Sequence, residues 1–128
     1  MKLLAAQDHQ PPAEGDARTV ALPNDADAMT VPLEGVTRVD LHFPSFTDGR
    51  AFSQAFLLRR RRGFAGEIRA TGDVLIDQLV QMQRTGFSSA VLREGVDPAD
   101  AQRQFEMFPG FYQGDAVNPQ PLFAGKAA

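Results

Sequence analysis

The chain has 128 residues, 43% of them hydrophobic and 23% charged, which is the size and balance of one globular domain. The absence of cysteine excludes disulfides, thiolate zinc sites, cysteine-ligated iron–sulfur clusters and a cysteine nucleophile, and it suits a cytoplasmic location. A net charge of −3 offers no general attraction to nucleic acid, and the apolar run at residues 3–6 is too short for a signal peptide or a membrane span.

The first 19 residues are polar and show no hydrophobic period, so residues 1–19 are predicted to form a flexible tail. Residues 20–128 are predicted to form a single α/β domain that ends in an irregular C-terminal arm. The domain begins with a short apolar run, after which Asn24 or Asp25 is expected to cap a brief helix that Pro32 ends.

Three strands alternate apolar and polar residues, which is typical of strands with one buried face. They are residues 37–43, 67–70 and 87–93. A helix is expected after each strand, so the order is β-α-β-α-β-α. Short connections and right-handed crossovers then predict a parallel sheet of three or more strands, either two-layered or resembling part of a barrel.

The helix boundaries follow from capping residues and glycines. The first helix is expected to begin at Thr47 or Asp48, the second at Gly72-Asp73, and the third at Asp97-Pro98, an N-cap followed by a first-turn proline. Glycines or a Pro-Gly pair are expected to end them, at Gly63, Gly86 and 109–110. Phe108 is expected to face the core from the third helix.

The second face of the predicted sheet is polar, whereas parallel sheets covered on both sides have apolar strands. Its residues are Asp40, His42, Glu67, Arg69, Ser89 and Arg93, with Val91 as the apolar exception. One explanation is a two-layer sheet with this face in water or against a partner subunit. The other is a half-barrel or a strand-end site that binds a polar ligand.

Three loops at the carboxyl ends of the strands are candidate ligand sites, because parallel α/β folds bind ligands there. They are residues 44–50, 71–73 and 94–97. Free backbone N–H groups at the helix starts favour anions, and Arg50 and Arg69 would clamp an oxyanion such as phosphate or sulfite. Alternatively, Asp48 and Asp73 cap helices and the two arginines pair with acidic neighbours.

Other polar groups carry weaker signals. Glu67 and Arg69 point the same way from one strand, and the guanidinium keeps the carboxylate ionised, which suits orientation or an ion pair. His42 is either a general base or a titrating surface group. The four arginines at 59–62 either bind an acidic partner or end a solvated helix. We find no spacing typical of a metal site, and no dinucleotide-binding, P-loop or hydrolase motif.

Several motifs together resemble the bacterial domain of unknown function 934 family. They are residues 43–53 (FPSFTDGRAFS), 57–59 (LLR), 66–74 (GEIRATGDV), 77–78 (DQ) and 86–87 (GF). The resemblance covers roughly residues 20–115, and the chain departs from it in a short N-terminal region and in extra arginines after position 59. The positions that it marks are Asp48, Gly49, Arg50, Ser53, Arg59, Glu67, Arg69, Gly72, Asp73, Asp77 and Gln78. All of these except Gly49, Asp77 and Gln78 are candidates for binding an anion or a partner.

Members of that family carry the label of oxidoreductases involved in sulfite reduction, through their association with sulfite reductase and other enzymes of sulfate assimilation. The resemblance therefore implies a role in sulfur assimilation with one of these enzymes as partner. Because these side chains carry no electrons unaided, redox catalysis would need a borrowed cofactor, such as a flavin held by its phosphate, whereas an accessory protein needs none. Two alternatives remain: a small enzyme or binding module using Arg50, Arg69 and Asp73 at the strand ends, and a structural homodimer whose polar faces meet.

Overall fold

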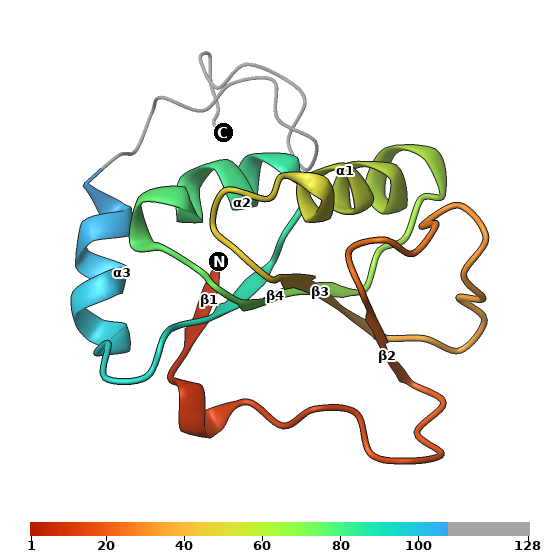
Figure 1. Cartoon of the computed structure of the whole chain (residues 1–128), viewed down its shortest axis with the longest axis horizontal. Coiled ribbons are helices and arrows are strands. Elements are labelled where there is room, and N and C mark those ends of the chain that lie inside the picture. The colour runs from red at the N-terminus through yellow and green to blue at the C-terminus, as the bar shows by residue number, and fades with distance from the viewer. Residues whose placement is uncertain (108–128) are drawn as a thin grey trace.

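The computed structural model describes residues 1–107, which form an α/β domain with one five-stranded parallel sheet in the order β1-β5-β4-β3-β2. The strands are β1 (Lys2–Leu4), β2 (Thr19–Leu22), β3 (Arg38–Phe43), β4 (Glu67–Gly72) and β5 (Ser89–Val91). The helices are α1 (Arg50–Phe56), continued by the π-helical turn η2 (Leu57–Arg61), α2 (Leu79–Thr85) and α3 (Pro98–Glu106), with short 3-10 turns η1 (Ala6–Asp8) and η3 (Ile76–Gln78). Helices α1 and α2 cover one face of the sheet, so the two-layer prediction is confirmed (Figure 1).

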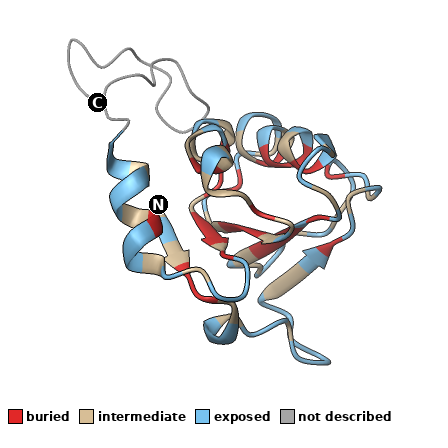
Figure 2. Ribbon diagram, turned by 60° about the vertical axis from the view of Figure 1, so that its left-hand side comes forward, coloured by how far each residue is buried: buried red, intermediate tan, exposed pale blue. Residues whose placement is uncertain are grey.

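The core lies between the sheet and helices α1 and α2. Figure 2 shows buried residues on the strands and on the sheet-facing sides of these helices. Val39 and Leu41 of β3 are fully buried, as the alternating pattern predicts. Phe43 packs edge-on against Phe52 of α1, with ring centroids 5.1 Å apart, and lies 5.7 Å from the ring of Phe87. These aromatic contacts join the strand to the helical layer.

The structure corrects the predicted N-terminal region. Lys2–Leu4 is a strand paired with β5, an element that the sequence does not predict within residues 1–19. Thr19–Leu22 is also a strand, and the helix expected after it is replaced by turns. Strands of three or four residues are too short to show an alternating pattern, so their pairing partners decide the conformation.

Two of the three predicted helix starts are wrong. Asp97 caps α3 by accepting a hydrogen bond from the backbone N–H of Ala99, as expected. Helix α1 has Gly49 rather than Thr47 or Asp48 at its N-cap, although the Asp48 carboxylate accepts a hydrogen bond from the backbone N–H of Arg50, the first helical residue, at 3.0 Å. The second helical segment begins only at η3, after extended backbone.

The reason for the late start lies in Gly72 and Asp73. Gly72 ends β4 with a φ of +90°, and the Asp73 carboxylate binds groups in neighbouring loops instead of a helix N-terminus. Strand β5 is shorter than the predicted residues 87–93. Phe108, the break at 109–110 and the C-terminal arm lie outside the described residues. None of the helices within residues 1–107 has the length and apolar character needed to cross a bilayer.

Candidate functional site

The chain's own N-terminal segment covers part of the polar face of the sheet. Residues 5–18 run along the face opposite α1 and α2 (Figure 1). Asp40, Arg69 and Ser89 on that face are only 3%, 6% and 1% exposed. Asp40, Glu67, Arg69 and Ser89 therefore share a face as predicted, and three of the four are buried, whereas Arg93 lies beyond β5, exposed and paired with Asp73.

One half of this layer is centred on Glu67. Its Oε2 atom accepts hydrogen bonds from Arg69 Nη2 at 2.8 Å, Arg69 Nε at 3.0 Å and Ser89 Oγ at 2.6 Å. The parallel register places Arg69 beside Ser89 on the adjacent strand. Burial opposes ionisation of Glu67, but the hydrogen bonds from Ser89 and Arg69 outweigh it, so the pKa of the carboxyl lies below its ordinary value.

The other half pairs Arg38 with Asp40. The guanidinium binds both carboxylate oxygens, with Nε 2.8 Å from Oδ1 and Nη2 3.0 Å from Oδ2. Arg38 also donates to the carbonyl of Gln10, and Arg69 Nη1 donates to Nδ1 of His9 at 3.0 Å. These bonds hold the N-terminal segment on the sheet.

We call His9, Arg38, Asp40, Glu67, Arg69 and Ser89 the polar-face network. Its two guanidinium groups are balanced by its two carboxylates, and burial lowers the pKa of His9, which favours the neutral imidazole. Each nitrogen of the Arg69 guanidinium has a protein partner. This group is therefore already engaged and is not free to clamp an anion.

At the strand ends, Asp73 joins two loops. Its Oδ1 accepts a hydrogen bond from Arg93 Nη2 at 2.6 Å, and its Oδ2 accepts one from the backbone N–H of Phe46 at 2.9 Å. The Phe46 hydrogen bond is the largest cause of the lowered pKa of Asp73, and Arg93 adds to it. Gln78 Nε2 donates to the carbonyl oxygen of Phe46 at 2.7 Å. Both backbone polar groups of Phe46 are thus bound by side chains from the chain after β4.

Arg50 belongs to a separate group with Asp48. The carboxylate accepts from Arg50 Nη2 at 2.8 Å and from Asn24 Nδ2 at 2.7 Å. Hydrogen bonds from Arg50 are the main reason that the pKa of Asp48 falls to about 2. Arg50 begins α1, whereas Arg69 lies on the opposite face of the sheet, so the structure does not bring the two proposed clamp residues together.

The remaining candidates tie loops together or lie apart from these groups. Arg59 donates to the carbonyls of Phe64, Gly66 and Gly86 at 2.6 to 2.9 Å. Ser53 is exposed on α1. Through Arg59, the arginine row at 59–62 therefore fixes neighbouring backbone and is not only a solvated helix end.

Sequence reasoning missed the parts that His9, Asn24 and Arg62 play. Arg62 donates to the carbonyls of Ala28 and Val31, which fixes the loop after β2. No pattern around these residues indicates such contacts, because their partners lie 24 to 60 positions away in the sequence.

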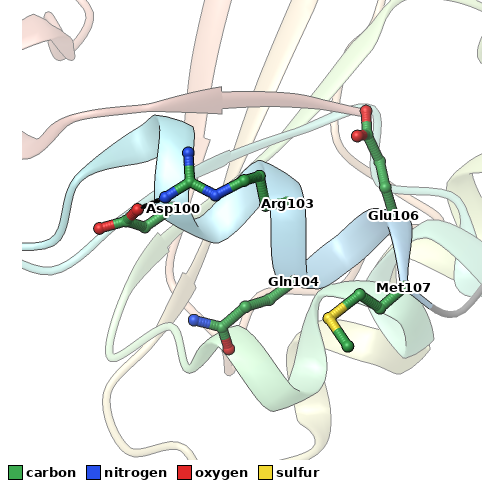
Figure 3. Close-up of a pocket in the computed structure, with 5 residues that line it drawn as sticks. All are labelled: Asp100, Arg103, Gln104, Glu106 and Met107. Carbon is green, nitrogen blue, oxygen red and sulfur yellow. Dashed lines mark ion pairs between the residues drawn. The ribbon is translucent and has the colours of Figure 1, made fainter.

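A hollow of about 580 Å³ on α3 differs from these groups, because its charged side chains pair within the helix. It is lined by Asp100, Arg103, Gln104 and Glu106 of α3 and by Met107 at its C-cap (Figure 3). Asp100 and Arg103 form an ion pair within the helix, and Gln102 donates to Glu106. Within the described part of the chain, no group of three or more potential metal-ligating side chains comes together.

Comparison with known proteins gives a family without an assigned activity. No curated protein and no solved structure matches this chain. A family model for bacterial proteins of unknown function, DUF934, matches residues 19–123, which include β2 to α3, the polar-face strands and the loops at their carboxyl ends. The chain belongs to the DUF934 family of bacterial proteins of unknown function.

Proposed function

We propose that this protein is a cytoplasmic accessory component of assimilatory sulfite reduction that acts by docking to sulfite reductase. The family motifs support the pathway, and a chain without cysteine supports an accessory role rather than electron transfer by its own side chains. The engagement of Arg50 and Arg69 with their acidic neighbours favours docking over an anion site that needs both guanidinium groups.

The observation that carries the docking proposal is the presentation of Phe46. Phe46 is 44% exposed, so much of its ring is not buried in this protein's own core. Burial of that apolar surface against a partner would stabilise a complex. Asp73 and Gln78 bind the N–H and carbonyl groups of Phe46 and hold the loop in one conformation. Because the backbone that carries the ring is already held, binding costs little ordering of the loop, which is typical of an interface anchor.

Charged groups near this loop indicate the partner's chemistry. Arg50 begins α1 and Arg93 follows β5, and their side chains are 62% and 50% exposed. Each guanidinium is already neutralised by an aspartate, so an apolar pocket with neutral hydrogen-bond acceptors at its rim would receive the ring and the exposed edges of these ion pairs. We place that pocket on sulfite reductase.

The test is binding of the full chain to purified sulfite reductase. Phe46→Ala is expected to weaken the complex about 30-fold, as for an interface anchor worth about 2 kcal/mol. Phe56→Ala is the matched control, because Phe56 on α1 is 43% exposed and is expected to leave affinity unchanged. Equal affinities of the two variants, or no complex with the parent protein, would refute the proposal. Self-association that Phe46→Ala abolishes would instead indicate a homodimer.

A further inference from the structure

A second hollow, of about 360 Å³, lies between the N-terminal segment and the ends of β2 and β3. The apolar part of its lining consists of Pro11, Pro12, Ala21, Leu22 and Pro23, of which Leu22 also belongs to the core. The volume is within the range of small-molecule sites, and the carboxyl ends of parallel strands are a frequent place for them. Proline rings offer flat apolar surfaces against which a ring compound packs.

The rest of the lining forms a polar wall. It contains His9, Asp40, His42 and Thr71, so both histidines of the chain line this hollow although they lie on different segments. Thr71 Oγ1 and His42 Nδ1 are 3.4 Å apart, at the rim where His42 is exposed. Asp40, by contrast, is almost fully buried at the inner end.

The hydrogen bond from Arg69 assigns the tautomer of His9. A guanidinium only donates, so Nδ1 of His9 is the acceptor and the proton of the neutral imidazole is on Nε2. His9 Nε2 lies 3.9 Å from Asp40 Oδ2, which is too far for a direct hydrogen bond. The hollow therefore presents an N–H donor beside a carboxylate acceptor, separated by a gap that a single oxygen atom can bridge.

The charges around the gap between His9 and Asp40 decide which kind of ligand oxygen fits there. A hydroxyl accepts from His9 and donates to Asp40, whereas a carboxylate or phosphate oxygen without a proton would face the Asp40 charge. The nearby guanidinium groups of Arg38 and Arg69 already bind carboxylates. A neutral hydroxyl group therefore matches the polar wall better than an anion.

We propose that this hollow binds a neutral ring compound with a hydroxyl group, which bridges His9 Nε2 and Asp40 Oδ2 while the ring packs against Pro11 and Pro12. The hollow does not include the Phe46 loop, so the test of this ligand site is independent of the test of docking to sulfite reductase. It assigns a ligand-binding role to the N-terminal segment, which the sequence predicts to be a flexible tail.

The first test compares three probes on the full chain by NMR of the histidine ring nitrogens. Phenol is expected to shift the His9 signals saturably. Anisole, which cannot donate, is expected to bind about tenfold more weakly, because it loses a hydrogen bond to a carboxylate. Benzoate is expected to bind no better than anisole. Equal binding of phenol and anisole, tighter binding of benzoate, or a shift that does not saturate would each overturn the proposal.

The second test uses variants. His9→Phe keeps a flat ring but removes the N–H donor, and it is expected to weaken phenol binding about tenfold while leaving the binding of toluene, which has no oxygen atom, unchanged. Asp8→Ala is the matched control on the same segment, since Asp8 is exposed and does not line the hollow. Unchanged phenol binding by His9→Phe would overturn the proposal. If His9→Phe also loses toluene binding, the substitution has displaced the N-terminal segment, and the comparison of phenol with anisole in the parent protein then decides.

Discussion

Asp73 and Arg93 form a 2.6 Å hydrogen-bonded ion pair between the chain after β4 and the chain after β5. The second oxygen of the same carboxylate binds the backbone of Phe46, after β3. One aspartate thus connects the carboxyl ends of three adjacent strands. This arrangement explains why Asp73 does not start a helix: its acceptor oxygens are committed to other loops.

Asp73→Ala is predicted to loosen the Phe46 loop, because it removes the acceptor for the Phe46 N–H. The expected result is faster hydrogen exchange of that amide and weaker binding to sulfite reductase. Asp73→Asn keeps an acceptor oxygen and is expected to lie between the parent protein and Asp73→Ala in both measurements.

Asp77→Ala is the control for this prediction, since Asp77 is an exposed carboxylate in the neighbouring turn. It is expected to leave the exchange of the Phe46 amide unchanged. Slow exchange of that amide in Asp73→Ala would show that the carboxylate does not hold the loop.

Much of the fold follows from local sequence patterns. The alternation of Val39, Leu41 and Phe43 predicts a strand with one buried face, and Asp97-Pro98 predicts the start of α3. Strand β1 has only three residues and is held by its ladder with β5, so no local pattern indicates it.

The candidate site was predictable only in part. The period of a strand places Glu67 and Arg69 on one face, and the structure confirms their ion pair. The contribution of His9 was not predictable, because it arises from a contact with Arg69 across 60 positions of the sequence. Arg69 lies in a predicted strand and Arg50 follows one. The side of the sheet that each side chain occupies depends on tertiary packing, which local sequence does not show.

Glu67 predicts a pH dependence of stability. Its pKa is lower in the folded protein than its ordinary value, so the stabilisation is present above the unfolded pKa near 4.5 and is lost as the pH falls through the folded pKa. Urea unfolding between about pH 5 and pH 3 is expected to show a smaller loss of stability for Glu67→Gln than for the parent protein. Parallel pH profiles for the two proteins would contradict the role of this carboxylate.

Arg59→Ala is predicted to destabilise the fold by about 2–4 kcal/mol, because three backbone carbonyls lose their donor. Urea unfolding measures the change in free energy. Arg61→Ala is the control from the same arginine row, and this exposed position is expected to change stability by less than about 0.5 kcal/mol. Similar losses for both variants would mean that charge, rather than the three hydrogen bonds of Arg59, decides stability.

Gly72→Ala tests the tight end of β4. Gly72 has a φ of +90°, and a Cβ atom there would collide with the Phe43 carbonyl oxygen and lie 2.7 Å from Cε1 of His42. The variant is expected to lose more than about 2 kcal/mol, since it combines an unfavourable backbone conformation with a clash against a neighbouring strand. Gly49→Ala is the control, because its φ of −92° is accessible to alanine and its Cβ would meet open space, so a loss below about 1 kcal/mol is expected. Equal stability of the two variants in urea would show that the end of β4 relaxes to accommodate a side chain.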